Sequence, residues 1–344
     1  MLNSTSRLLY LCAIVLLTLL AGCSSDKGQQ VNVYSARKAE LVEPLLQRFE
    51  AETGIQVNLV TGAADALIQR LKAEGKASPA DVLITVDAGR LYRAKQMELT
   101  QALDDSALLA SVPDAYRDPN GHWLGLSLRA RPIMYAPDRV NPEMLSTYEA
   151  LADDVWQGRI CIRSSSNIYN QSLVASMIAA SGADAVEQWA SKLVNNFARN
   201  PVGGDRDQIK AVAAGQCDVA VANTYYLFGM LNSPDEAEVK AAQQVAVFWP
   251  NQSNRGTHVN ISGIAMTQSA QNKNQAQKLM AYLLQPESQA WYAQVNGEYP
   301  VTASAQIHPV LQSWGEFKKD DINVLRLGEL NTEAVKVMDR AGWR

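Results

Sequence analysis

The sequence predicts an α/β protein of two lobes that are joined by at least two crossing strands and enclose a ligand cleft. Short β-branched runs alternate with helical patterns over the first part of the chain, which is typical of a parallel sheet. A second series of the same kind begins after Pro132. Two strand patterns, 245–249 and 259–265, then follow one another without a helix between them. We interpret these two strands as crossings back to the first lobe.

The first lobe is expected to comprise residues 31–131 together with about 257–344. Apolar residues three and four positions apart predict its helices, and short β-branched runs predict its strands. Gly54 suits the end of the first helix because glycine accepts a left-handed backbone. The predicted strands are 31–34, 55–60 and 81–85, and the predicted helices are 41–49, 64–74, the stretch from 91 onward, 271–284 and 286–296, followed by a polar tail.

The second lobe is expected to comprise residues 132–256. Its strands read as short apolar runs, and its helices carry apolar residues on one face. The predicted strands are 159–163 and 218–222, and the predicted helices are 170–180, 189–197 and 206–214.

The N-terminus predicts export and a lipid anchor. Arg7 precedes an apolar run of residues 8–21, which is too short to span a membrane comfortably as a mature helix and suits a cleaved signal peptide of residues 1–22. Leu-Ala-Gly-Cys at 20–23 resembles the lipobox of bacterial lipoproteins, so Cys23 is expected to be acylated and residues 23–30 to form a polar tether. The alternative is a signal peptide that is cut elsewhere. The protein is placed on the periplasmic or cell-surface side of a bacterial membrane, attached by lipid only.

Two cysteines remain after the signal peptide and Cys23 are set aside. They are Cys161, within the predicted strand 159–163, and Cys217, directly before the strand 218–222. In an oxidising compartment, an even number of remaining cysteines suggests that they pair, here as one disulfide. Two buried free thiols are the alternative.

Composition excludes several classes of function. The chain has 31 basic and 35 acidic residues and no basic run, so nucleic acid is not expected as a partner. The three histidines, His122, His258 and His308, show no metal or catalytic spacing. No glycine-rich phosphate loop and no nucleophile elbow occur. We therefore do not expect an enzyme.

Tyr225 and Tyr226 form the most informative pair in the chain. They follow the apolar strand 218–222. Asn223 and Thr224, which separate this strand from the two tyrosines, suit a turn or a helix N-cap. If the chain leaves the strand there, both phenols can face one site at the carboxyl end of a sheet, where α/β folds bind ligands. Phenolate oxygen is a hard anionic donor that suits ferric iron. Core packing is the alternative explanation.

Several motifs, in this order, are similar to those of the ferric-ion-binding proteins that serve ABC-type iron importers. The resemblance covers about residues 31–344 and implies the bilobal fold of periplasmic binding proteins, ferric iron as cargo, an ABC permease as partner and a monomeric protein. In the multi-tyrosine branch it implies the ligands Tyr34, Tyr169, Tyr225 and Tyr226. The motifs are Val-Tyr-Ser-Ala-Arg at 33–37, Ser-Pro-Ala-Asp-Val at 78–82, Leu-Arg-Ala-Arg-Pro-Ile-Met-Tyr at 128–135, Arg-Ser-Ser-Ser-Asn-Ile-Tyr-Asn-Gln-Ser-Leu at 163–173, Asn-Thr-Tyr-Tyr-Leu at 223–227 and Arg-Ala-Gly-Trp at 340–343.

The chain departs from the family pattern after residue 37. Many relatives have a histidine there, whereas this chain has Lys38, whose ammonium group has no lone pair to donate. The acidic ligand of other branches would fall near Val86 or Asp87, of which only Asp87 could ligate. Because Tyr34 would belong to one lobe and the other tyrosines to the second, the lobes are expected to close on iron.

Charge balance predicts accessory groups at the site. Four phenolates on a trivalent ion leave one negative charge, and three leave none. Ionising a free phenol at neutral pH costs roughly 4 kcal/mol, which the ion and nearby cations offset. Candidates for charge compensation or anion binding are Arg37, Arg129 and Arg131, and the resemblance implies a synergistic anion such as carbonate. Ser164, Ser165 and Ser166 precede a helix and could hold that anion. Structural ion pairs and an ordinary capping turn are the alternatives.

A different ligand is the main competing hypothesis. The same fold carries organic cations such as polyamines or thiamine, but those sites favour aromatic walls and carboxylates over clustered phenols. A ferric-phenolate protein absorbs visible light, so colour separates the two hypotheses.

Overall fold

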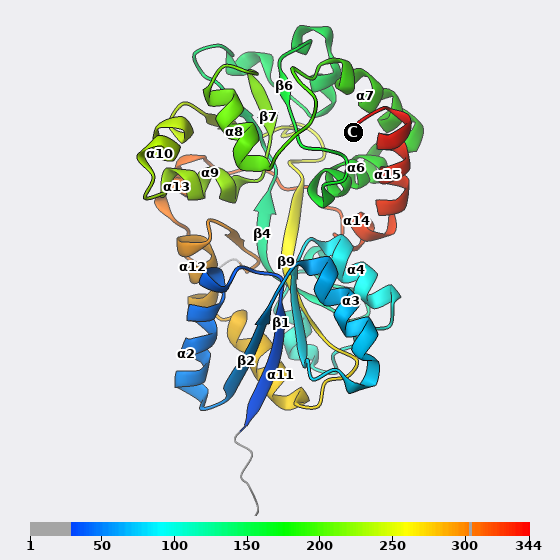
Figure 1. The fold of residues 1–344 in the computed structure, drawn as a ribbon, viewed down its shortest axis with the longest axis vertical. Helices are drawn as coiled ribbons and strands as arrows, with labels where there is room; N and C mark the ends of the chain where they lie inside the picture. Colours follow the sequence, from blue (N-terminus) through cyan, green and yellow to red (C-terminus); the bar gives the residue numbers. More distant parts are fainter. Residues whose placement is uncertain (1–28, 303–304) are drawn as a thin grey trace, which may run out of the picture.

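The computed structural model describes residues 29–302 and 305–344. The predicted signal peptide, the lipidation site Cys23 and most of the tether lie outside these residues. Two separate sheets form two lobes that follow one another along the long axis of the molecule (Figure 1). Strands β4 (Leu124–Ala130) and β9 (Val259–Met266) run from the first lobe toward the second (Figure 1). The predicted bilobal α/β architecture is confirmed, but one of the two predicted crossing strands is wrong. The run 245–249 forms β8 (Ala246–Phe248), an edge strand of the lobe 2 sheet, and only the run 259–265 returns to lobe 1, as β9.

Lobe 1 is built around a six-stranded sheet in the order β10-β4-β9-β3-β1-β2. Strands β1, β2 and β3 are parallel, and β9 is antiparallel to both of its neighbours β3 and β4. The carboxyl ends of the parallel strands point toward lobe 2 (Figure 1). The remaining elements of the lobe are β1 (Gln30–Ser35), β2 (Gln56–Thr61), β3 (Val82–Val86), β10 (Tyr299–Pro300), α2 (Glu43–Thr53), α3 (Ala64–Glu74), α4 (Ala88–Gln96), α5 (Ser106–Ala110), α11 (Lys273–Leu283) and α12 (Pro286–Val295).

The helices of lobe 1 follow the apolar spacing of the sequence. α2 buries Leu45, Leu46 and Phe49 against the sheet and ends at Gly54, whose φ of 69° is left-handed. α3 buries Leu67, Ile68 and Leu71 in the same way. Helices therefore cover both faces of a sheet whose central strands are buried, as parallel sheets require.

Lobe 2 has a smaller sheet in the order β6-β7-β5-β8. The parallel neighbours β6 and β7 bring Cys161 and Cys217 together as a disulfide, with Cα atoms 5.8 Å apart. The predicted bridge is confirmed. The elements of the lobe are β5 (Ile133–Tyr135), β6 (Ile160–Cys161), β7 (Val219–Val221), β8 (Ala246–Phe248), α6 (Ile168–Ser181), α7 (Ala183–Asn195), α8 (Asp205–Ala213), α9 (Thr224–Leu231) and α10 (Glu236–Ala242).

The C-terminal segment is not the polar tail that the sequence analysis predicted. It forms α13 (Pro309–Ser313), α14 (Leu325–Glu329) and α15 (Asn331–Arg340). α14 packs against α4 of lobe 1 and α6 of lobe 2, and α15 packs against α6 and α7. The buried Trp343 contacts the rings of Trp189 and Phe197 at centroid distances of 6.3 and 5.7 Å. The assignment of all residues from 257 to 344 to lobe 1 is therefore wrong at its end, because α15 belongs to lobe 2.

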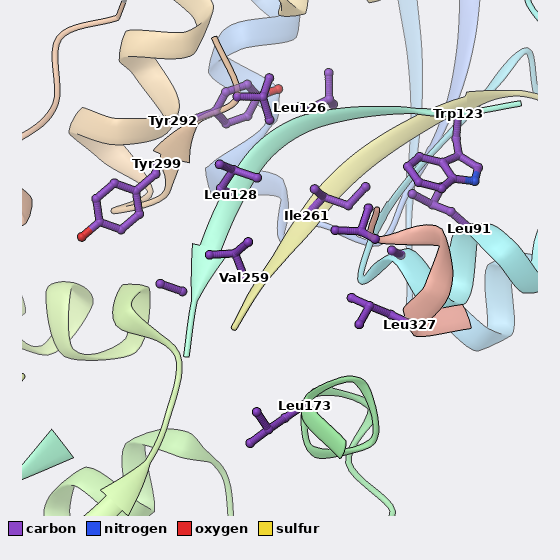
Figure 2. Packing of buried hydrophobic residues seen from close by; sticks show 14 of the residues in the cluster. Leu91, Trp123, Leu126, Leu128, Leu173, Val259, Ile261, Tyr292, Tyr299 and Leu327 are labelled. Atoms are coloured by element: carbon purple, nitrogen blue, oxygen red, sulfur yellow. The ribbon is translucent and has the colours of Figure 1, made fainter. Parts of the chain in front are cut away.

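A continuous hydrophobic core holds the two long strands in place. Leu126 and Leu128 of β4 lie beside Val259 and Ile261 of β9, and Leu173 of α6 lies on the lobe 2 side (Figure 2). All eight residues of β9 are buried. The strands that connect the lobes are thus rigid supports for the polar residues at their ends. Within the part of the chain that the structure describes, no helix is long and apolar enough to cross a membrane.

Candidate metal centre

Two helix starts in lobe 2 bring three tyrosines together. Tyr169 lies in the first turn of α6, where the side chain of Asn167 caps the helix by accepting from the Tyr169 N–H at 3.2 Å. Tyr225 and Tyr226 lie in the first turn of α9, which begins at Thr224 directly after the N-cap Asn223. Both helices follow the carboxyl ends of the parallel strands β6 and β7, and both lie on the side of lobe 2 nearer to lobe 1 (Figure 1). The chain leaves the strand before Asn223 and enters α9, so the two phenols need not point to opposite faces of a sheet.

The three phenols form one cluster. The Tyr225 hydroxyl donates to the Tyr169 hydroxyl at 3.3 Å. The rings of Tyr225 and Tyr226 lie 4.2 Å apart between centroids and are tilted by 34°. Within the described ranges, no group of three histidine, cysteine, aspartate or glutamate side chains could hold a metal ion. The tyrosines are thus the cluster of hard donors that this chain offers.

Tyr225 and Tyr226 keep their phenol protons at physiological pH in the absence of a ligand. Burial raises the pKa of Tyr225 well above its ordinary value, and the neighbouring Tyr169 and Tyr226 raise it further. Burial and Tyr169 together raise the pKa of Tyr226 to about 12. Deprotonation of this cluster therefore requires a strongly positive partner.

Three arginines surround the ring of Tyr169. The guanidinium carbons of Arg129, Arg131 and Arg163 lie 5.3, 6.0 and 5.8 Å from its centroid. Arg129 and Arg131 were predicted from the sequence. Arg163 was missed, because nothing in its local pattern distinguishes it from a surface residue. Positive charge at these distances favours the ionised form of a nearby phenol.

Arg129 has unused hydrogen-bonding capacity. It is 2% exposed, and its Nη2 donates to the carbonyl of Ile261. Its Nε and Nη1 have no partner among the described residues. Burial opposes its charge, but Tyr169, Tyr225 and nearby carboxylates raise its pKa above the ordinary value. It remains a cation with two buried nitrogens, Nε and Nη1, whose N–H groups have no partner among the described residues and are of the kind that bind anions.

The other two predicted arginines are already paired. Arg131 donates to Asp205, Asn223 and Asn170, which satisfies both of its terminal nitrogens. Arg37 forms a buried ion pair with Glu298 at 2.6 Å. The charge of Arg37 is therefore already neutralised, so it is a poor source of compensation for a bound ion.

The serine turn lies next to Tyr169 but does not cap the helix with a serine. The Ser164 and Ser166 hydroxyls lie 2.9 Å apart, and the Ser166 N–H donates to the Ser164 hydroxyl at 3.1 Å. The carbonyl of Ser165 accepts from the side chain of Gln171. Asn167 is the capping residue instead.

Tyr34 does not join the cluster, so its prediction as a ligand is wrong. Its side chain is 1% exposed and packs under α3 and α4 with Leu67, Ile68 and Leu71. Its hydroxyl donates to both carboxylate oxygens of Glu74 at 3.0 Å. Glu74 ends α3 close to the amino end of β3, whereas a ligand would have to face the carboxyl ends of the strands. Closure of the lobes would not expose a side chain that is buried inside lobe 1.

The remaining candidates of lobe 1 are also structural. Lys38 is largely exposed and pairs with Glu40. Asp87 is fully buried and accepts hydrogen bonds from Ser172 and Asn260. A cavity of about 740 Å³ lies in lobe 1 and contains none of the tyrosines; Lys95, Thr100 and His122 are among its lining residues.

The fold and the clustered donors define a bacterial binding protein that holds a small solute. The family model for bacterial extracellular solute-binding proteins matches residues 45–319, and the chain belongs to this family. It is therefore a solute-binding protein and not an enzyme, as the sequence analysis predicted.

Relatives of this chain include an iron uptake protein and an Fe(3+)-binding protein. The chain is 48% identical to iron uptake protein A1 of Synechocystis sp. over 316 residues, which cover 92% of this chain and 88% of that protein. It is 28% identical to an Fe(3+)-binding periplasmic protein of Serratia marcescens, over 93% of this chain and 91% of the relative.

Solved structures of proteins that bind iron have the same fold as this chain. A Trichodesmium protein (IdiA, FutA) in complex with iron and citrate ligands superposes with a TM-score of 0.89 and is 48% identical, covering 92% of this chain and 100% of that one. Ferric iron-binding protein A of Mannheimia haemolytica in an open conformation gives a TM-score of 0.85 at 39% identity, with 92% and 99% covered.

Proposed function

We propose that this protein captures ferric iron outside the cytoplasm through Tyr169, Tyr225 and Tyr226 and delivers it to an ABC permease. The observation that carries the proposal is the cluster of three phenols, with the hydroxyls of Tyr225 and Tyr169 only 3.3 Å apart. Three phenolates neutralise one trivalent ion, and phenolate is a hard donor. Relatives of this chain that bind iron support the same cargo.

The coordination shell is completed by groups that the protein does not supply. All three phenols come from lobe 2, and Tyr34 is engaged elsewhere. We expect a small anion such as carbonate, or water, in the open positions. The free Nε and Nη1 of Arg129 support an anion next to the ion, and the serine turn at 164–166 offers hydroxyls nearby.

The arginines also argue against an organic cation as the ligand. Arg129, Arg131 and Arg163 surround Tyr169, and Asp205 is the carboxylate that pairs directly with two of them. A polyamine or thiamine would meet net positive charge here, whereas an ion that is bound by phenolates and an anion would be stabilised.

The membrane attachment belongs to the same proposal. Acylation of Cys23 would hold a monomeric protein on the outer side of the membrane through the tether 23–30, within reach of a permease. Mass spectrometry of the protein extracted from membranes tests the lipid, and a Cys23→Ser variant should be released into the soluble fraction.

A visible spectrum tests the cargo. The soluble protein of residues 24–344, loaded with ferric citrate, should bind one iron and show a ferric-phenolate charge-transfer band. Tyr225→Phe together with Tyr226→Phe should abolish the band, whereas Tyr34→Phe should retain it. A colourless parent without iron by elemental analysis would refute the proposal, and heat released on titration with spermidine or thiamine would favour the organic cation.

A further inference from the structure

Four buried polar side chains link the starts of the two helices that carry the tyrosines. They are Arg131, Asn170, Asp205 and Asn223, and we call them the Arg131 hub. We propose that the Arg131 hub is a positioning device, which fixes Tyr169 relative to the Tyr225–Tyr226 pair before iron arrives. The proposal rests on the proposed ferric site and assigns Arg131 a geometric role instead of anion binding.

The side chain of Asn170 fixes the start of α6. Its Nδ2 donates to the carbonyls of Arg163 and Ser164 at 2.8 and 3.2 Å, which closes the turn before the helix. Its Oδ1 accepts from Nη2 of Arg131 at 2.6 Å. Asn170 is fully buried and directly follows Tyr169. One amide thus ties the turn that leads to Tyr169 to a guanidinium group outside α6.

The other terminal nitrogen of Arg131 fixes the start of α9. Nη1 donates to Oδ1 of Asn223 and to Oδ2 of Asp205, both at 3.0 Å. The same Asp205 oxygen accepts from the Asn223 N–H at 2.9 Å. Asn223 directly precedes the helical turn that carries Tyr225 and Tyr226. The rigid fork of one guanidinium therefore spans both helix starts.

The hub is also anchored to the crossing between the lobes. Arg131 lies between β4 and β5, and its backbone N–H donates to the carbonyl of His258 at 3.1 Å. Its side chain is 1% exposed, and that of Asp205 is fully buried. Buried polar groups that are paired in this way resist rearrangement, because each broken bond leaves an unsatisfied group. The positions of the phenols are thereby coupled to a rigid part of the fold.

A lysine cannot replace this fork. Arginine presents fixed planar donors, whereas lysine offers one compact ammonium group that cannot reach both sides at once. Arg131→Lys therefore separates the two possible roles. A residue that acts through its charge tolerates the change, and a residue that acts by positioning does not.

The main experiment is a double-mutant cycle in the soluble protein of residues 24–344. We expect Asn170→Ala to weaken ferric binding roughly 10–100-fold, the effect typical of residues that orient metal ligands. The intensity and position of the charge-transfer band of Asn170→Ala should approach those of the band of Tyr169→Phe. Combining Asn170→Ala with Tyr169→Phe should cost little beyond Tyr169→Phe alone, because both remove the same ligand.

Gln171→Ala is the matched control. Gln171 lies on the same helical turn, and its amide donates to the Ser165 carbonyl at 3.0 Å, but its oxygen accepts from Asn331 and does not touch the hub. Its affinity for iron should stay within about twofold of the parent, as for substitutions away from a key network. Thermal unfolding of every variant identifies those that are folded.

Arg131→Lys is a second, independent test of the positioning role, and it tests that role alone if Asn170→Ala does not fold. We expect it to lose affinity to a similar extent as Asn170→Ala. Parental affinity in Arg131→Lys, or losses that add fully in the Asn170–Tyr169 cycle, would overturn the inference while leaving the ferric site intact. A parent protein that binds no iron would instead overturn the proposed function.

Discussion

The number of protons released on iron binding follows directly from the phenol cluster. The Tyr225 hydroxyl donates to the Tyr169 oxygen, and burial raises the pKa values of Tyr225 and Tyr226, so both of these phenols keep their protons in the empty site. A ligating phenol must lose its proton. Three ligands therefore release three protons, and four ligands would release four.

This count sets the pH dependence of affinity. If each ligating phenol exchanges its proton for the ion, three ligands correspond to three protons released between about pH 6 and about pH 8. The apparent binding constant should then fall by about three powers of ten for each unit decrease in pH. Acid thus promotes release, and the slope is steep enough to count the ligands.

The assay compares variants, so that the protonation of the iron chelator and of any synergistic anion cancels. Competition with citrate is measured for the parent, Tyr226→Phe and Tyr34→Phe over the same pH range. Tyr226→Phe should lower the slope by about one power of ten per pH unit. Tyr34→Phe should leave the slope unchanged, because that phenol is bound to Glu74. An unchanged slope in Tyr226→Phe, or a reduced one in Tyr34→Phe, would refute the ligand assignment.

Two further predictions concern stability. Replacing Cys161 and Cys217 by alanine should lower the free energy of unfolding by about 4 kcal/mol, from the loop entropy of a 56-residue separation; denaturant titration measures it, and an unchanged midpoint would contradict the estimate. Trp343→Ala should cost about 3–5 kcal/mol because it empties a buried aromatic site, whereas the exposed neighbour Arg344→Ala should cost little; equal midpoints for the two variants would disprove the packing role.

Local patterns were enough to place the Tyr225–Tyr226 pair of lobe 2. A short apolar strand followed by Asn223 and Thr224 leaves the sheet in a predictable way, so both phenols of the pair fall in one helical turn. Tyr169 was predicted from the family resemblance. The helix predicted from spacing began at residue 170, whereas α6 begins at Ile168 after the N-capping Asn167. The disulfide could also be predicted, because the two remaining cysteines lie at two predicted strands. These strands, β6 and β7, are parallel neighbours in the structure.

Tyr34 could not be placed by the same reasoning. The strand predicted at 31–34 ends at Tyr34, but β1 continues through Ser35, so Tyr34 is still inside the sheet. Val31 and Val33 point to one face and Tyr34 to the other, and helices cover both faces. Alternation in a sheet that is buried on both sides does not say which face leads to the ligand.

The Arg131 hub and the last helix were missed for different reasons. The hub joins residues that are far apart in the chain, such as Arg131 and Asp205, and no local spacing reports such a pair. The last helix could in principle have been predicted from the sequence. Ala334, Val337 and Met338 have helical spacing and are buried, but charged residues between them obscured the pattern.

The position of α15 constrains how the protein matures. Lobe 1 lacks β9 and β10 until most of the described chain has been made, and in lobe 2 helices α6 and α7 lack their partner α15 until residues 331–340 have been made. Trp343 also donates to the carbonyl of Arg163, directly before the turn that leads to Tyr169. Both lobes are therefore completed by segments that lie far away in the chain, and contacts of such long sequence separation form slowly. In a chain that emerges amino end first, the phenol cluster reaches the surroundings seen in the structure only after α15 and Trp343 have been made.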